Sequence, residues 1–384
     1  MSDVSAPGKD RRKRFLIGQL GSYGDCLYAT TVARQIKADY QGCHVTWAIA
    51  SIYRSILDGN PDIDEIWEFP LRVRNDLLDH WQEFENEATE RKSRGDFDEI
   101  YLTQVFPNNI KNFDGTLRSS IFRAYDKPIT VPVAPVLRLS PAEVETVRSF
   151  ALFHRLPERR HNILFECSPK SGQSFVTLDM ALQVSRNLID KVADTCVILS
   201  SNECFTSPDE RIIDGSVLSF RENAELTKYC TLLVGCSSGI SWLCTSDWAN
   251  PLPMIQLLEK GTNIYASFIY DHEYQGLPTD EILEMTNCTA DVLLDCIIET
   301  LTEGIWQSKK KFHQVVKLKF DYYFGAIFNH LILKDKFCDA GKSIKNTLQR
   351  YGLSRQILVT CCLYVFKYIK HKIWLTYNKA KEVE

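Results

Sequence analysis

The chain has 384 residues, of which 45% are hydrophobic and 24% are charged. This length exceeds one ordinary core and predicts two domains with an additional segment, and the composition is that of a globular protein rather than a disordered or fibrous one. The formal net charge is only −4, so no nucleic-acid partner is expected.

The N-terminus predicts a cytosolic protein. It is polar and then basic from residue 9 to residue 14, with no apolar segment of secretory-signal length before the first predicted strand. The 13 cysteines are scattered through apolar segments and form no Cys-x-x-Cys pair. We therefore expect small buried thiols in a reducing compartment, with neither a disulfide framework nor a metal site.

The first predicted unit is a strand, a glycine-containing turn and a helix. An apolar strand begins at Phe15, and apolar residues return at helical spacing between Leu27 and Tyr40. Glycines leave amide groups open in such a turn, and a helix start favours anionic or oxygen-rich ligands. We expect a polar ligand to bind at the turn, which consists of Gly21, Ser22, Tyr23, Gly24 and Asp25.

Asp25 has two explanations at this stage. Aspartate is a favoured N-cap, whose side chain bonds the free amides of the first helical turn. A carboxylate at a strand end can also point into a ligand cleft and act in catalysis. The turn alone does not distinguish them, because a glycine-rich turn is a weak motif.

Strands and helices continue to alternate along the chain. Strands are predicted at 44–50 and 99–105, with helices at 51–57 and 72–92. Prolines punctuate 128–160, which contains a helical run at 141–156. A second alternation has strands at 162–167, 195–201, 231–234 and 254–258, with helices at 178–189, 224–230 and 239–245. This pattern predicts an α/β fold of two doubly wound parallel sheets facing a cleft.

We divide the chain accordingly into four predicted segments. The first domain covers 13–140, a linker with a helix covers 141–160, the second domain covers 161–305, and a helical extension covers 306–384. Ligands of open parallel sheets bind beyond the carboxyl ends of the strands, so the two domains are expected to enclose a binding cleft between them.

Several segments together carry a family resemblance. They are Gly21-x-x-Gly24-Asp25-x-Leu27-x-x-Thr30-x-Val32-x-Arg34, Val45-Thr46-Trp47, Asn60-Pro61-Asp62-Ile63-Asp64-Glu65-Ile66, Ser168-Pro169-Lys170, and Leu233 to Trp242. In this order and spacing, over residues 14 to 300, the chain resembles glycosyltransferase family 9, the heptosyltransferases of bacterial lipopolysaccharide synthesis.

The resemblance implies a GT-B fold of two Rossmann-like domains. It implies that the first domain binds the acceptor and the second binds a nucleotide-sugar donor, which is a co-substrate rather than a cofactor. The acid that matches Asp25 would deprotonate the acceptor hydroxyl. No metal is expected, because helix N-termini and basic side chains can stabilise the leaving phosphate.

The chain departs from the family in its second half. The family has Asp-x-Gly-x-x-His at the start of a late helix, where this chain has Ser237, Gly239 and Trp242. The serine hydroxyls and the amides of Ser238 and Gly239 can still hold phosphate; alternatively, Ser237 only caps the helix. Because the acid and the histidine are missing, we expect a nucleotide sugar other than ADP-heptose.

Five further residues are site candidates, each with a surface position as its alternative. Ser168 and Lys170 lie where the family neutralises the donor phosphate. Glu203 follows a predicted strand, where an acid can accept hydrogen bonds from ribose. Arg54 and Arg123 lie where the family's acceptor domain faces the cleft, and guanidinium groups suit acidic sugars or phosphates.

The extension has its own charge pattern. From residue 309 to 384 there are 16 Lys and Arg against 5 Asp and Glu, a balance of +11. The short apolar segment 357–366 precedes Lys367, Lys370 and Lys372, as in helices that lie on anionic membrane surfaces. The alternative is a helical brace that packs across both domains.

The sequence therefore predicts a metal-independent glycosyltransferase of the hexosyl or heptosyl type that modifies a lipopolysaccharide, capsule or related glycan. The acceptor would be a glycan or a lipid-linked saccharide. The protein would be cytoplasmic, with peripheral attachment to the inner membrane. The alternatives are a GT-B nucleotide-sugar epimerase or hydrolase, and a non-catalytic glycan-binding scaffold, because a fold does not determine a function.

Overall fold

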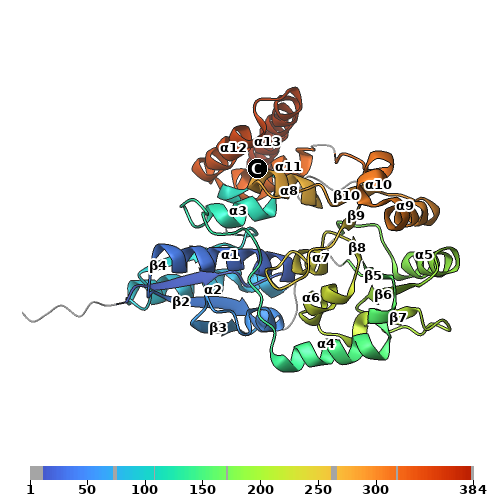
Figure 1. The fold of residues 1–384 in the computed structure, drawn as a ribbon. Coiled ribbons are helices and arrows are strands. Elements are labelled where there is room, and N and C mark those ends of the chain that lie inside the picture. Colours follow the sequence, from blue (N-terminus) through green and yellow to red (C-terminus); the bar gives the residue numbers. More distant parts are fainter. Residues whose placement is uncertain are drawn as a thin grey trace, which may run out of the picture.

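The structure is a computed structural model that describes residues 12–71, 76–107, 109–169, 172–260, 266–316 and 319–381. Two parallel sheets lie side by side, each covered by helices, and the last helices of the chain lie above both (Figure 1). Within these ranges, the helices are too short or too polar to cross a membrane.

The N-terminal domain has four parallel strands in the order β3-β2-β1-β4. They are β1 (Arg14–Gly18), β2 (His44–Ala50), β3 (Glu65–Phe69) and β4 (Glu99–Leu102). The connections contain α1 (Tyr23–Asp39), the 3₁₀ helix η1 (Ser51–Leu57) and α2 (Asp76–Ser93). The central strand β1 is apolar and almost fully buried because helices cover both faces of a parallel sheet.

Helix α1 begins four residues earlier than the sequence predicts. It starts at Tyr23, so Gly24 and Asp25 belong to its first turn and not to the preceding loop. Ser22 occupies the N-cap position, although its side chain makes no capping bond. Asp25 is therefore not the N-cap residue, since it is the third residue of the helix.

A long connection joins the two sheets. It contains η2 (Asn109–Asn112), α3 (Leu117–Arg123), α4 (Pro141–Phe153) and η3 (Leu156–Glu158). Helix α4 starts with a capping box: Ser140 accepts a bond from the Glu143 amide, and the Glu143 carboxylate accepts one from the Ser140 amide. Pro141 follows at the first helical position, where its missing N–H costs nothing.

The C-terminal domain has six parallel strands in the order β10-β9-β8-β5-β6-β7. They are β5 (His161–Glu166), β6 (Thr195–Ser200), β7 (Ile212–Asp214), β8 (Leu232–Gly235), β9 (Met254–Leu258) and β10 (Ile282–Thr286). Its helices are α5 (Leu178–Lys191), η4 (Gly215–Val217), α6 (Glu222–Leu226), η5 (Thr227–Tyr229), α7 (Gly239–Leu243), α8 (Phe268–Gln275) and α9 (Ala290–Glu303). The α/β prediction of two parallel sheets is confirmed.

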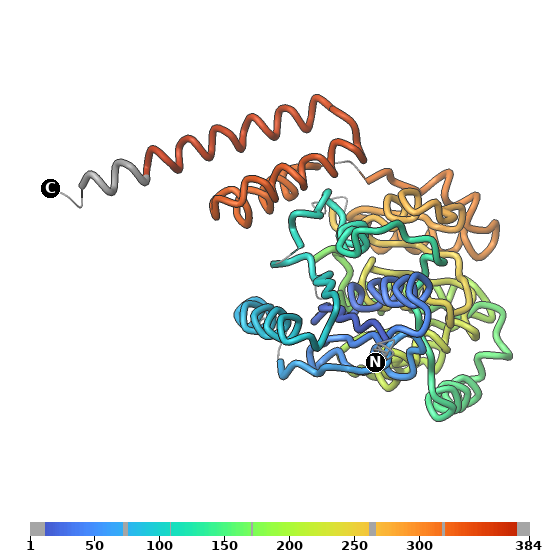
Figure 2. Tube along the Cα trace, turned by 90° about the vertical axis from the view of Figure 1, so that its left-hand side faces the viewer, coloured from blue at the N-terminus to red at the C-terminus, as the bar shows by residue number. Residues whose placement is uncertain are grey.

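The C-terminal extension is helical, as the sequence predicts. It contains α10 (Ile305–Phe312), α11 (Asp321–His330), η7 (Ile332–Lys334), α12 (Phe337–Tyr351) and α13 (Arg355–Lys381). Helix α12 returns to the N-terminal domain, where the Ser343 hydroxyl donates to the Phe113 carbonyl at 2.6 Å. Helix α13 then runs away from the body of the molecule (Figure 2). The extension therefore has a docked part and a protruding part.

Strand β10 contributes a buried acid, Glu284, which lies at the start of α8 and has a shifted pKa. The Glu284 carboxylate accepts from the Ser267 hydroxyl at 2.8 Å and from the Ile269 amide at 3.1 Å. Burial outweighs these bonds and raises the pKa of Glu284 from 4.5 to about 7. The folded protein thus holds this proton at pH values where the unfolded chain has released it. This contribution to stability is fully present below pH 4.5 and is lost as the pH rises through 7.

Glu284→Gln is expected to remove this part of the pH dependence, because glutamine does not ionise. Between pH 5 and pH 8, the free energy of unfolding of the wild type should fall by roughly 2–3 kcal/mol more than that of the variant. Urea unfolding of the wild type and the variant at both pH values measures it. If the stability of the variant fell between these pH values by as much as that of the wild type, Glu284 would not be the source of this pH dependence.

Candidate active site

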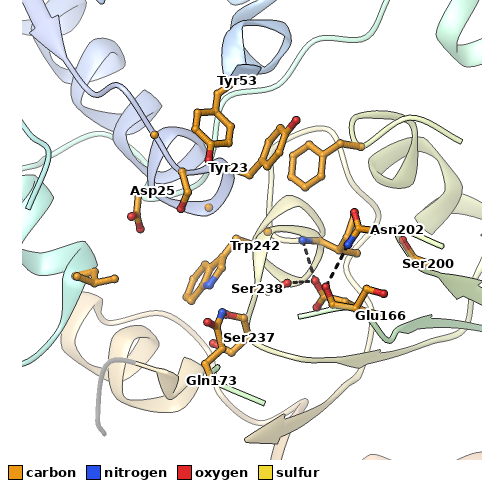
Figure 3. A pocket seen from close by; sticks show the side chains of 18 of the residues that line it. Tyr23, Asp25, Tyr53, Glu166, Gln173, Ser200, Asn202, Ser237, Ser238 and Trp242 are labelled. Atoms are coloured by element: carbon orange, nitrogen blue, oxygen red, sulfur yellow. Dashed lines mark hydrogen bonds between the residues drawn. The ribbon is translucent and has the colours of Figure 1, made fainter. Parts of the chain in front are cut away.

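A cleft of about 1020 Å³ lies between the two sheets, at the carboxyl ends of their strands. Its wall in the N-terminal domain comes from the β1–α1 turn, η1 and α3, and its wall in the C-terminal domain from β5, β6 and the β8–α7 loop. Figure 3 shows Tyr23, Asp25 and Tyr53 on one side and Glu166, Ser238 and Trp242 on the other. The fold thus brings both halves of the predicted site together.

The buried side chains of Gln19 and Gln104 fix the β1–α1 turn by hydrogen bonds. Gln19 donates to the Gly21 carbonyl at 2.6 Å and to the Gln104 side-chain oxygen at 3.0 Å, and this oxygen also accepts from the Gly21 amide at 3.1 Å. A Cβ on Gly21 would lie 2.4 Å from the Tyr53 ring. The turn therefore requires glycine at this position, and Gly21, Ser22, Tyr23 and Gly24 all line the cleft.

Asp25 projects from the first turn of α1 and lines the cleft while half-buried. Next to it, Tyr23 donates to the Ile52 carbonyl at 3.2 Å, and its ring lies 4.3 Å from that of Phe220 in the C-terminal domain. Burial raises the pKa of Tyr23, so the phenol stays protonated at neutral pH. The arrangement places a carboxylate at the seam between the domains.

The β8–α7 loop differs from its predicted role. Ser237 is 1% exposed and has a left-handed backbone with φ of +50°. Its hydroxyl donates to the Ala266 carbonyl, and its amide donates to Gln256 at 2.8 Å. The hydroxyl is thus directed at the protein, and the N-cap position of α7 belongs to Ser238. Ser237 therefore neither caps the helix nor offers its hydroxyl to a ligand.

Trp242 fills the position where the family has histidine. It is 1% exposed, stacks on Phe268 with 3.7 Å between the ring centroids, and carries the Arg118 guanidinium 3.5 Å above its ring. Arg118 in turn pairs with Asp271 at 2.8 Å, and both side chains are buried. Arg118 lines the cleft but had no signal in the sequence, because its partners lie far away along the chain.

Ser168 is placed in the cleft, where its hydroxyl lies 2.9 Å from that of Ser201. Ser238 and Gly239 also line the cleft. Lys170 lies outside the described residues. Glu203 is exposed and is not among the lining residues, so the structure does not support its proposed contact with ribose.

Neither predicted acceptor arginine lines the cleft. Arg54 is 45% exposed on η1 and pairs with Asp58, four residues later, and with Glu68 at 3.7 Å. Arg123 pairs with buried Asp114 at 2.7 Å and donates to the Tyr274 hydroxyl at 2.7 Å. Arg123 is therefore engaged by the protein's own side chains and Arg54 lies at the surface, so the acceptor-binding role of these two residues stays a prediction that the cleft lining does not support.

Most of the cysteines are buried in the two cores, and none is disulfide-bonded. Over the described ranges, the structure brings together no group of three or more His, Cys, Asp or Glu side chains that can hold a metal ion.

No family model matches the sequence, and no curated protein does. The structure, by contrast, is similar to solved structures. One is a family 9 glycosyl transferase from Veillonella parvula, with 13% identity and a TM-score of 0.53; the match covers 78% of this chain and 95% of that one. Another is the ADP-heptose lipopolysaccharide heptosyltransferase II of E. coli, with 15% identity, a TM-score of 0.49, and coverage of 76% and 99%.

A putative UDP-N-acetylglucosamine 2-epimerase from Listeria monocytogenes is similar at 12% identity and a TM-score of 0.45, over 85% of this chain and 97% of that one. At sequence identities this low, the similarity shows the fold alone. The resemblance that the sequence predicts is thereby confirmed at the level of architecture: the chain has the two-domain GT-B fold of a family 9 glycosyltransferase, with an added helical extension.

Proposed function

We propose that the protein is a glycosyltransferase that moves a hexosyl or heptosyl group from a nucleotide sugar to a hydroxyl of a lipopolysaccharide, capsule or related glycan. The observation that carries the proposal is Asp25, which lines the cleft between the two domains from the first turn of α1. In this fold an acceptor bound by the N-terminal domain would meet a donor bound by the C-terminal domain in that cleft.

Asp25 is proposed as the general base. A carboxylate can take the proton of an acceptor hydroxyl if it reaches it directly or through one water. The β1–α1 turn is fixed by Gln19 and Gln104, so it holds the start of α1 and with it Asp25 in a defined place. Such positioning is what acid–base catalysis requires of the protein.

The donor is proposed to be a nucleotide sugar bound along Ser168, Ser238 and Gly239, which line the wall contributed by the C-terminal domain. E. coli heptosyltransferase structures have been solved with ADP and with an ADP-linked fluoro-heptose. Here Trp242 replaces the family's histidine and is enclosed by Phe268 and Arg118. We therefore propose a donor other than ADP-heptose, and a transfer that needs no metal ion.

Acceptor dependence is the test of this proposal. A panel of nucleotide sugars is incubated with the protein, with and without deacylated lipopolysaccharide and capsule oligosaccharides, and the released nucleotide is measured. A transferase releases nucleotide faster when its acceptor is present. If the donor is isomerised without any acceptor, the protein is an epimerase instead. If nucleotide is released but acceptors do not stimulate the release, it is a hydrolase. If no donor is bound or turned over, the protein is non-catalytic.

We also propose that helix α13 attaches the protein to an anionic membrane surface. The helix has 27 residues, of which six are basic and none is acidic. Its inner face packs on α11, where the Tyr364 hydroxyl donates to the Asp321 carbonyl at 3.0 Å. Its outer face is apolar and exposed, and consists of Leu358, Val359, Leu363, Val365, Phe366, Ile369, Ile373 and Trp374.

These apolar residues recur at helical spacing, and Lys367, Lys370 and Lys372 lie among and beside them. This combination suits a helix that lies in the headgroup region of an anionic leaflet. Each basic residue near such a surface contributes on the order of 1 kcal/mol, and the attraction is screened within a Debye length of about 8 Å at physiological salt. A lipid-linked acceptor would be available at the same surface.

Replacing Leu363, Phe366 and Ile373 by glutamine is expected to abolish sedimentation with vesicles that contain anionic lipid. The wild type should sediment with these vesicles, less so at high salt, and not with neutral ones. The matched control is Phe153→Gln, which removes a side chain that is 82% exposed on α4, far from α13 in the sequence. Equal sedimentation of wild type and triple variant would contradict membrane attachment through this face.

A further inference from the structure

The last residue of β5, Glu166, directs its carboxylate into the β8–α7 loop. One carboxylate oxygen accepts from the Cys236 amide at 2.9 Å and the Ser241 hydroxyl at 2.6 Å. The other accepts from the Ile240 amide at 3.2 Å and from the Ser238 hydroxyl. Figure 3 shows Glu166 beside Ser238 on the floor of the cleft. Four donors of the loop and the first turn of α7 thus converge on a single anionic group supplied by the chain itself.

This carboxylate is 3% exposed and lines the cleft. Its charge acts on the thiols around it: burial, and after it the charge of Glu166, raises the pKa of Cys236 and raises that of Cys167 to about 12. Each carboxylate oxygen has two acceptor sites, so two donors at each leave the group saturated. Four of the donors that this loop and the first turn of α7 could offer to an incoming phosphate are therefore already in use.

The rest of the donor wall is neutral among the residues that the structure describes. Its lining side chains are hydroxyls, amides, a thiol and apolar groups, namely Ser168, Gln173, Ser200, Ser201, Asn202, Cys204, Ser216, Leu218 and Asn223. The only cation among the described lining residues is Arg118, and it is paired with buried Asp271. The Glu166 charge is thus the dominant charge at the floor of this wall.

We infer that Glu166 determines the donor specificity of the cleft, by occupying four hydrogen-bond donors at the β8–α7 loop and weakening the binding of a phosphate there. This inference rests on the proposed function, in that it takes the cleft to bind the nucleotide part of a donor. The nucleotide is then held through neutral hydrogen bonds, and a second phosphate adds little affinity. The preferred donor class carries a single phosphate, or places its diphosphate away from the β8–α7 loop.

Glu284 provides a matched control inside the same domain. It is also a buried glutamate of a strand, in the middle of β10, and its carboxylate also accepts hydroxyl and amide bonds at the start of a helix. Unlike Glu166, it does not line the cleft. If Glu166 served only to hold a loop in place, as Glu284 does for α8, neither residue would affect nucleotide specificity.

The experiment measures dissociation constants of AMP, ADP, UMP, UDP, CMP and CDP by calorimetry. Wild type should bind each diphosphate within about threefold of its monophosphate, because Glu166 occupies four of the local donors and places a negative charge beside the second phosphate. In Glu166→Ala the vacated loop should favour the diphosphates by roughly tenfold or more, which corresponds to about 1.4 kcal/mol. Glu166→Gln removes the charge but keeps the volume, so a smaller preference of the same sign is expected, and Glu284→Gln should behave as wild type.

Glu166→Gln keeps the inference testable if the alanine variant does not fold. A wild type that binds diphosphates at least about tenfold better than monophosphates, with loss of that preference on substitution of Glu166, would overturn it. Absence of any diphosphate preference in both Glu166 variants would overturn it too. Sugar transfer by the wild type tests the proposed function separately. If the wild type transferred sugar from a diphosphate donor and this transfer required the Glu166 carboxylate, only the inference about Glu166 would be refuted.

Discussion

Asp25→Asn is expected to lower the rate of sugar transfer by about 10²–10⁴-fold, the range typical for the loss of a general base. Asparagine keeps the size of the side chain and its ability to hydrogen-bond, but it does not accept the acceptor's proton at neutral pH. The loss should lie in kcat, while nucleotide affinity stays near that of the wild type. Steady-state kinetics with saturating donor measures both quantities.

The fold should survive this substitution, because Asp25 is not the N-cap of α1 and its side chain is half-buried at the cleft. The melting temperature of the variant checks this directly. Asp58→Asn is the matched control: it removes an exposed acid of the same domain that pairs with Arg54 and does not line the cleft. If Asp25→Asn transferred sugar within a few-fold of the wild-type rate, Asp25 would have no catalytic role.

The second large effect is expected at Arg350, which fastens the extension to both domains. Its guanidinium pairs with Asp114 of the N-terminal domain at 3.1 Å and donates to the Tyr270 carbonyl of α8 at 3.1 Å. Asp114 is fully buried, and Arg123 is its other charged partner, at 2.7 Å. Burial alone would raise the pKa of Asp114, but the two guanidinium groups outweigh it and hold the pKa below its usual value.

Arg350→Leu should therefore destabilise the protein by about 3–5 kcal/mol, since it leaves a buried carboxylate short of one partner. Urea unfolding measures the loss, and limited proteolysis should show earlier cleavage of the extension. The double variant that combines Arg350→Leu with Asp114→Asn should regain part of the lost stability, because an asparagine side chain does not require a cation as its partner. Lys342→Gln is the control, as its pair with Asp126 is exposed. A loss below about 1 kcal/mol, typical of surface pairs, would show that the cluster is not a structural lock.

The same cluster changes how the extension is tested. A version that ends before α11 would remove Arg350 together with α13, so loss of stability and loss of membrane binding would coincide. The docked part of the extension behaves as a brace between the domains, and α13 protrudes from it (Figure 2). The brace thus concerns the docked helices and the proposed membrane attachment concerns α13, and substitutions on the outer face of α13 separate the two.

Hydrophobic periodicity was sufficient to predict the alternation of strands and helices. The strand at 254–258 and the short helix at 51–57 have the predicted bounds, because buried parallel strands are short, apolar and bounded by polar turns. The start of α1 was misplaced, since Gly24 and Asp25 are poor helix formers whose conformation is set by the packed turn before them. The same alternation predicted two domains that face a cleft, and the family resemblance added which domain would bind the acceptor and which the donor.

Individual site residues were harder to predict, because a charged side chain's partners are often remote in sequence. Arg123 is committed to Asp114 and Tyr274, the latter about 150 residues away, and Arg118 to Asp271 at a similar separation. Glu166 had a signal that was not used: it is a carboxylate that directly follows the apolar residues Ile163 to Phe165 at the end of a strand. Buried acids need partners, so such a residue indicates a polar site at the strand end.

The most direct test of the proposed sugar transfer is the mass of the acceptor. Deacylated lipopolysaccharide and capsule oligosaccharides are incubated with a pool of nucleotide sugars and with wild type or Asp25→Asn, and the glycans are weighed by mass spectrometry. We predict that one glycan gains the mass of a single hexosyl or heptosyl residue with the wild type and not with the variant. Glycans of unchanged mass, alongside donor that is isomerised or hydrolysed, would contradict it.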